Sequence, residues 1–214
     1  MMRVGVLISG RGSNLQSLID ARDAGSLPVE LVTVVSNVAG TQGIERAKAA
    51  GIASSVVDHK KFEGRASFED AVNDTLLEAG VEFLCLAGFM RLLTDGFANN
   101  WRDRLINIHP SLLPAFKGLD THVRAIEAGV RFAGCTVHFV RPAMDEGPII
   151  VQAAVPIMPG DTPASLGKRV LAEEHKIYPL ALRLIAEGRA SVDGERVIID
   201  GPDAALAAVI NPPG

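Results

Sequence analysis

The first half of the chain alternates short apolar segments with segments whose apolar residues recur every three or four positions. An apolar run without polar alternation is typical of a strand buried on both faces, and the wider spacing is typical of an amphipathic helix. The strands expected on this basis lie at residues 3–9, 31–36, 54–57, 83–87 and 105–108. Helices are expected between the first four strands, at residues 13–24, 44–50 and 67–79. This rhythm predicts an α/β fold with a Rossmann-like, open, mostly parallel twisted sheet and helices on both faces.

The second half departs from this alternation. Two apolar segments, 134–140 and 148–155, follow each other without a helix between them, which predicts an antiparallel element in this half. Thr162 followed by Pro163 is typical of the start of a helix, which we expect to run to about residue 187.

The end of the chain carries a hairpin signal. Asp193-Gly194 lies between extended residues and predicts a hairpin over residues 191–199. We therefore expect a single domain over residues 1–190, followed by a C-terminal hairpin and a loose tail over residues 191–214.

Composition narrows the classes of protein to which the chain can belong. It has 214 residues, of which 48% are hydrophobic, and its 21 Lys and Arg against 25 Asp and Glu give a formal charge of −4. Proteins that bind nucleic acid or an anionic membrane usually carry a basic excess, so neither partner is expected. The longest apolar run, residues 83–90, is too short to span a bilayer, and the N-terminus lacks the features of a signal peptide. A cytoplasmic protein is expected.

A glycine-rich turn follows the first predicted strand. Gly10, Gly12, Ser13 and Asn14 precede a helix, where glycines and free helical N–H groups can surround an anion. The third glycine of a dinucleotide fingerprint is replaced by Leu15, and the second strand ends without the acidic residue that holds a ribose. A phosphate monoester therefore fits better than a dinucleotide. A plain strand-to-helix turn with Ser13 as its cap remains the alternative.

A second polar cluster is predicted at the end of the strand over residues 105–108. Asn107 and His109 are two residues apart, so both side chains point to one face of an extended segment. An amide donor beside an imidazole suits the stabilisation of an oxyanion and the movement of a proton in acyl transfer. Asp145, in a later loop, would orient the imidazole if the fold brought it near His109. The alternative is a hydrogen-bonded strand end without chemistry.

Other catalytic patterns are missing from the sequence. It contains no G-x-S-x-G elbow and no H-E-x-x-H metal motif. Cys85 and Cys135 lie fifty residues apart and form neither a metal-ligand pattern nor a disulfide framework, so we expect two buried thiols. Direct attack by a group of the substrate is favoured over a covalent enzyme intermediate or metal-activated water.

Four motifs carry a resemblance to a known family. They are the segments Val6-Leu7-Ile8-Ser9-Gly10-Arg11-Gly12-Ser13-Asn14-Leu15, Leu86-Ala87-Gly88-Phe89-Met90-Arg91, Asn107-Ile108-His109-Pro110-Ser111-Leu112-Leu113-Pro114 and Asp145-Glu146-Gly147-Pro148. Over roughly residues 3–188 the chain resembles the phosphoribosylglycinamide formyltransferases, a branch of the folate-dependent formyltransferases. The resemblance implies transfer of a formyl group from 10-formyltetrahydrofolate, as cosubstrate, to the amine of N1-(5-phosphoribosyl)glycinamide in de novo purine biosynthesis.

The resemblance also implies roles for individual residues. The catalytic residues would be Asn107, His109 and Asp145. The phosphoribosyl substrate would be bound by Gly12, Ser13, Asn14 and Glu174. The formyl folate would be bound by Arg65, Met90, Arg91, Leu92, Leu93 and Asn107, with no metal ion required. The phosphate side would lie within about residues 1–100, and the folate and catalytic side within about 101–190.

Two positions qualify this assignment. Glu174 without the resemblance would be read as an ordinary exposed helix carboxylate. Some members of the family carry His-Thr-His where this chain has Asp120-Thr121-His122, so Asp120 is left out of the site and His122 is at most a supporting residue.

Three other functions remain as alternatives. A formyltetrahydrofolate hydrolase shares the core but carries an N-terminal regulatory domain, whereas this chain begins at its first predicted strand. A methionyl-tRNA formyltransferase carries a basic C-terminal extension, which is not found here. A nucleotide-binding regulatory module of the same fold would lack Asn107, His109 or Asp145, and all three are present. The sequence is compatible with a homodimer but does not give the oligomeric state.

Overall fold

The computed structural model describes residues 1–201 and 210–212. Within them a seven-stranded sheet has the order β3-β2-β1-β4-β5-β6-β7. Its strands are β1 (Met2–Ile8), β2 (Val29–Ser36), β3 (Ala53–Val56), β4 (Phe83–Leu86), β5 (Leu105–His109), β6 (Phe132–Phe139) and β7 (Ile149–Pro156). The first five are parallel, whereas β6 is antiparallel to both β5 and β7. The predicted mostly parallel sheet with an antiparallel element is confirmed.

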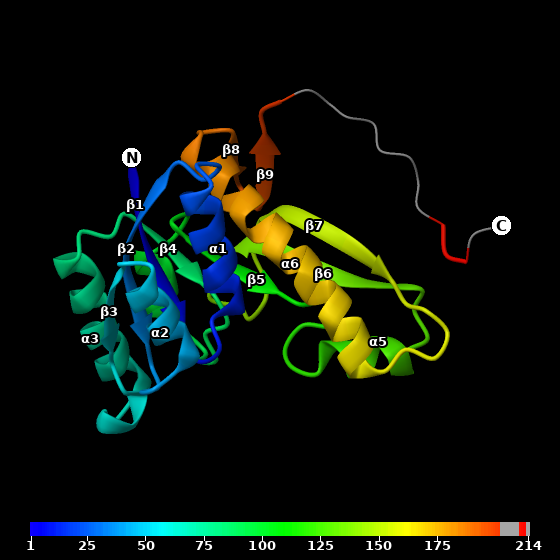
Figure 1. Ribbon diagram of the computed structural model, residues 1–214, viewed down its shortest axis with the longest axis horizontal. Helices are drawn as coiled ribbons and strands as arrows, with labels where there is room; N and C mark the ends of the chain where they lie inside the picture. Colours follow the sequence, from blue (N-terminus) through cyan, green and yellow to red (C-terminus); the bar gives the residue numbers. More distant parts are fainter. Residues whose placement is uncertain (202–209, 213–214) are drawn as a thin grey trace.

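Helices cover both faces of this sheet. They are α1 (Ser13–Asp23), α2 (Gln42–Ala49), α3 (Arg65–Glu78), α4 (Asp95–Asn100), α5 (Thr121–Glu127) and α6 (Pro163–Ala186), with a short 3-10 helix η1 (His59–Lys61). Buried residues of α1, α2, α5 and α6 share one hydrophobic core with the sheet, and those of α3 and α4 share the other. Figure 1 shows α1 and α6 lying side by side in front of the sheet.

The alternation of side chains along β1 explains how one strand serves two cores. Val4, Val6 and Ile8 face the first core, while Leu7 faces the second, and all four are fully buried. A central parallel strand therefore needs apolar residues at consecutive positions, which is the pattern that identified it in the sequence.

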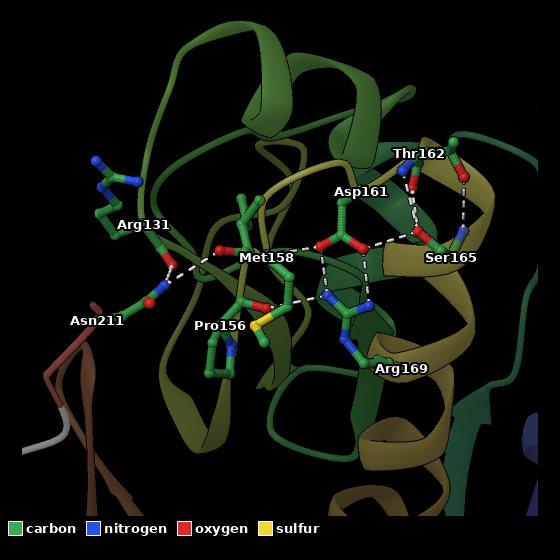
Figure 2. Close-up of polar contacts among 9 residues, drawn as sticks. Arg131, Pro156, Met158, Asp161, Thr162, Ser165, Arg169 and Asn211 are labelled. Atoms are coloured by element: carbon green, nitrogen blue, oxygen red, sulfur yellow. Dashed lines mark hydrogen bonds and ion pairs between the residues drawn. The ribbon is translucent and has the colours of Figure 1, made fainter. Parts of the chain in front are cut away.

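The longest helix begins as its sequence predicts. Thr162 is the cap, Pro163 is the first helical residue, and the Thr162 and Ser165 side chains accept reciprocal hydrogen bonds from the backbone N–H groups of Ser165 and Thr162. Asp161 precedes the cap and pairs with Arg169, whose Nη1 lies 2.8 Å from Oδ1 (Figure 2). These contacts fix the start of α6 against the end of β7, because Arg169 also donates to the carbonyl of Pro156.

The C-terminal hairpin is confirmed as β8 (Ala190–Asp193) and β9 (Arg196–Ile199), which pair antiparallel. The predicted loose tail falls largely outside the described residues. Asn211, which is described, donates through Nδ2 to the carbonyls of Arg131 and Ile157, at 2.7 and 3.2 Å (Figure 2). No helix in the described part of the chain is long and apolar enough to cross a membrane. The sequence pattern did not predict α4 or η1, whose short lengths give no apolar period.

Candidate active site

The polar pair predicted on β5 lies near the end of that strand. Asn107 and His109 alternate with buried Ile108 and point to the same face, and the side chain of His109 is 7% exposed. Their register partners on β6 are His138 and Thr136. The antiparallel pairing of β5 with β6 thus adds two further polar side chains to the same part of the sheet.

Asp145 reaches His109 from the loop between β6 and β7, so the fold brings this carboxylate to the imidazole. Its Oδ1 lies 3.4 Å from Nδ1 of His109, and its Oδ2 accepts a hydrogen bond of 2.7 Å from the N–H of Gly118. The loop turns sharply here, since Asp145 has a φ of 52° and Gly147 a φ of 121°. A Cβ on Gly147 would lie 2.1 Å from the carbonyl oxygen of Phe139, so only glycine permits this turn.

Both ring nitrogens of His109 face oxygen acceptors. Nδ1 faces the Asp145 carboxylate, and Nε2 lies 3.2 Å from the carbonyl oxygen of Phe116. The two loops that supply these acceptors are joined by an ion pair of 2.6 Å between Lys117 and Glu146. A doubly protonated imidazole therefore has an acceptor for each N–H.

His138 determines the orientation of the Asn107 amide. Burial lowers the pKa of His138, which keeps the ring neutral near neutral pH. Its Nδ1 lies 2.9 Å from the carbonyl oxygen of Phe139 and must donate there, so its Nε2 accepts from Nδ2 of Asn107 at 3.4 Å. One N–H of the amide is held by His138, and the other has no hydrogen-bond acceptor within residues 1–201 and 210–212. The candidate set from the sequence did not include His138, because its place opposite Asn107 depends on strand register.

The glycine-rich turn forms the start of α1, beside α6. Gly12 has a φ of 67° and caps the helix. Nδ2 of Asn14 donates to Oε2 of Glu174 at 2.7 Å, across 160 residues of sequence. Oδ1 of Asn14 is buried without a protein partner among the described residues. The turn and Glu174 therefore lie together, as the resemblance implied.

Glu174 is not the exposed helix carboxylate that its sequence context alone indicates. It is 7% exposed, and burial raises the pKa of its carboxyl while the hydrogen bond from Asn14 opposes that rise. The reading as a solvated side chain is wrong because α6 packs against α1 and β6 along this face.

Apart from Asn107 on β5, the residues expected to bind folate lie on α3 and on the segment after β4. Arg65 and Arg91 are exposed, and neither guanidinium has an ion-pair or hydrogen-bond partner within residues 1–201 and 210–212. Met90 and Leu92 are 71% and 59% exposed, whereas Leu93 packs against the second core. Exposed apolar groups and free guanidinium groups are the chemistry that a flat aromatic ligand with a carboxylate tail requires.

Glu69 connects these two elements. It is 4% exposed and accepts hydrogen bonds from the N–H and the hydroxyl of Thr94, the residue that caps α4. Arg65 lies one helical turn before Glu69 and therefore shares its face of α3. That face of α3 meets Thr94 through Glu69, although no hydrogen bond joins Arg65 itself to the segment after β4 in the described chain.

His122 lies near His109 but forms no hydrogen bond with it in the described part of the chain. It follows Asp120, the cap of α5, and packs against α6, where a Cβ on Gly167 would lie 3.0 Å from its ring. Burial lowers the pKa of His122, and the nearby His109 lowers it further.

The two cysteines are confirmed as buried thiols. Both are fully buried, and desolvation raises the pKa of Cys85 and of Cys135 to about 12. Because a thiolate is the reactive form, neither is prepared to act as a nucleophile.

Known proteins resemble the chain over nearly its whole length. Residues 2–182 match the formyl transferase family. The phosphoribosylglycinamide formyltransferase of Haemophilus influenzae is 42% identical over 201 residues, which cover 94% of this chain and 95% of that protein. The crystal structure of glycinamide ribonucleotide transformylase 1 from Symbiobacterium toebii has a TM-score of 0.91 and 49% identity, covering 93% of this chain and 94% of that one.

A longer relative matches only in part. The trifunctional purine biosynthetic protein adenosine-3 of Gallus gallus is 49% identical over 191 residues, which cover 89% of this chain. The chain spans about a fifth of that protein's length, since the match covers 19% of it.

Proposed function

The chain belongs to the formyl transferase family, and we propose that it transfers the formyl group of 10-formyltetrahydrofolate to the amine of N1-(5-phosphoribosyl)glycinamide, in the cytoplasm, as a step of purine biosynthesis. The observation that carries the proposal is the pairing of His109 with Asp145, at 3.4 Å, beside Asn107 at the end of β5. Two relatives, each matching 94% of the chain at 40–42% identity, are named phosphoribosylglycinamide formyltransferase, which supports the proposal.

The glycine-rich turn and Glu174 bind the phosphoribosyl group. The backbone N–H groups of Ser13 and Asn14 at the start of α1, together with their side chains, donate to the phosphate. Glu174 accepts hydrogen bonds from the ribose hydroxyls. Its contact with Asn14 supports this role, because it keeps a buried carboxylate beside the phosphate site.

The amine of the substrate attacks the formyl carbon directly. As the new C–N bond forms, negative charge develops on the formyl oxygen, and the free N–H of Asn107 donates to it. Nε2 of His109, which faces the carbonyl oxygen of Phe116 in the free protein, donates to the formyl oxygen instead. The Asp145 carboxylate accepts from Nδ1 of the same ring. The bond from the formyl carbon to N10 of the folate then breaks. The proton lost by the amine passes through water, assisted by Asp145, to N10.

The folate binds beside the second core, where α3 and the segment after β4 lie. The exposed apolar side chains of Met90 and Leu92, with Leu93 behind them, contact the pterin together with loop 140–144. The free guanidinium groups of Arg65 and Arg91 pair with the glutamate tail.

An absorbance assay tests the proposed activity. Purified protein is mixed with phosphoribosylglycinamide and 10-formyltetrahydrofolate, and release of the deformylated folate is followed. The proposal predicts release that depends on the amine substrate. Equal release without the amine would instead identify a formyltetrahydrofolate hydrolase, and no release from a folded protein that binds folate would contradict formyl transfer altogether.

A further inference from the structure

Helix α2 packs directly on the glycine-rich turn. The N–H of Gly43 donates to the carbonyl of Gly10 at 3.1 Å, and a Cβ on Gly12 would lie 2.7 Å from Cα of Gly43. The two backbones therefore touch with no side chain between them. Helix α2 thus holds the turn on one side of α1, and α6 with Glu174 packs on the other.

Arg46, one turn further along α2, binds the two ends of this turn. Its Nε donates to the carbonyl of Arg11 at 3.0 Å, and its Nη1 donates to Oε1 of Gln16 at 2.9 Å. Arg11 precedes Gly12, and Gln16 follows Asn14 on α1. The guanidinium thus spans the segment whose N–H groups would bind the phosphate. The planar fork of an arginine fixes the separation between two acceptors, which a lysine cannot do.

The contacts of the Arg46 side chain identify how it acts. Two of its nitrogen atoms donate to protein oxygens, one in the turn and one on the first turn of α1, so these contacts join the turn to the helix that follows it. Gln16 is in turn oriented by Asp20, which accepts from its Nε2 at 2.8 Å. An anion site made of backbone N–H groups binds tightly only if those groups are aligned before the ligand arrives.

We propose that Arg46 is a positioning residue for the phosphate: it holds residues 11–16 in the conformation that binds a phosphate monoester, through the Arg11 carbonyl and the Gln16 amide. The proposal rests on the proposed function, since it concerns the substrate phosphate. It goes beyond that function because it names a residue of α2 that keeps the phosphate site in its binding conformation.

Arg46→Met tests this role with two substrates, phosphoribosylglycinamide and the glycinamide riboside that lacks the phosphate. Loss of two charge-assisted hydrogen bonds predicts a rise of about tenfold in KM for the phosphorylated substrate. The KM for the riboside, the KM for the formyl folate and kcat should each change less than about twofold. A loss shared equally by both amine substrates would overturn the proposal, because it would reflect general damage to the fold.

Two further variants separate positioning from charge. Lys48→Met removes one positive charge from the same helix, at an exposed site that pairs with Glu45 and with no other carboxylate in the described part of the chain. It should leave the KM for the phosphorylated substrate unchanged. Arg46→Lys keeps the charge but not the fork, and it should restore less than half of the lost affinity. Full rescue by lysine would overturn the proposal in favour of a point-charge contact with the phosphate.

Gln16→Leu provides the test if Arg46→Met fails to fold. It should raise the KM for the phosphorylated substrate less than Arg46→Met does, and the two effects should not add in the double variant, because both remove one shared contact. Additive effects would overturn the proposal.

Binding of inorganic phosphate, measured by calorimetry, keeps this test independent of formyl transfer. Wild-type protein that binds phosphate without transferring a formyl group would contradict the proposed function, while Arg46→Met should still weaken phosphate binding. Phosphate binding that is equal in the two proteins, or absent from both, would overturn the role of Arg46.

Discussion

At the scale of single residues, His109 is the side chain on which the chemistry depends most. It is almost fully buried, and its two ring nitrogens face the Asp145 carboxylate and the Phe116 carbonyl. We predict that His109→Ala lowers kcat by about 10²–10³-fold, because one donor to the oxyanion is lost. Dissociation constants for both substrates, measured by calorimetry, should change little. Turnover within a few-fold of wild type would contradict the role of His109.

Glu174 gives a second prediction, which concerns stability and pH. Burial raises the pKa of its carboxyl in the folded protein, so ionisation favours the unfolded state. Wild type should therefore lose stability relative to Glu174→Gln as the pH rises above about 4.3, the ordinary value of a glutamate. Urea unfolding of both proteins between about pH 4 and pH 8 measures the difference. If the difference in the free energy of unfolding between the two proteins does not change with pH, burial does not raise the pKa of Glu174.

The same residues show how far a sequence can predict a site. Asn107 and His109 were predicted to share a face because a strand has a period of two, and this requires only local geometry. Asp145 was a candidate whose approach to His109 depended on the turn at Gly147, and the structure supplies that turn. The burial of Glu174 depends on how α6 packs on the sheet, and the position of His138 opposite Asn107 depends on the register of β6. Neither can be predicted from the local sequence.

At the scale of elements, the start of α6 depends on a compact polar cluster. The Asp161 side chain is 6% exposed, and the Arg169 guanidinium, together with the Met158 N–H and the Ser165 hydroxyl, holds the pKa of that carboxyl well below its usual range (Figure 2). Because the folded pKa lies below the unfolded value of about 3.9, this stabilisation is complete above that value and is lost as the pH falls towards the folded pKa.

We therefore predict that Asp161→Asn lowers the free energy of unfolding at neutral pH. The gap between wild type and variant should narrow as the pH falls below about 4, where the unfolded aspartate becomes protonated. Urea unfolding at a series of pH values provides the measurement. Glu45→Gln removes a carboxylate from an exposed pair with Lys48 and should change stability little at any pH. A gap for Asp161→Asn that does not depend on pH would show that the ion pair is not its cause.

The elements themselves divide into predictable and unpredictable ones. The longer helices were predicted because their apolar residues recur over several turns, and the buried strands because they are continuous apolar runs. The capping pair Thr162-Pro163 marks the start of α6. Helix α4 has six residues and is held by the hydrogen bonds from Thr94 to Glu69, a contact across 25 residues. Its formation depends on tertiary structure, so the local sequence did not indicate it.

At the scale of the whole molecule, the order of the strands brings the two halves of the site together. β1 and β4 are neighbours at the centre, and β5 follows, so the glycine-rich turn after β1 and the polar residues of β5 are separated by one strand. Helix α6 packs on α1 and β6 (Figure 1). This packing places Glu174 beside Asn14. The alternation of elements predicts the α/β class, but the strand order is decided by which helices fit which face.

The destination of the formyl group tests the proposed transfer most directly. We would incubate the protein with phosphoribosylglycinamide and a 10-formyltetrahydrofolate that carries ¹³C in its formyl group, and identify the labelled product by mass spectrometry. The account predicts that the label is found on the glycinamide amine, in an amount equal to the deformylated folate. Label recovered as free formate, with the glycinamide unchanged, would contradict it.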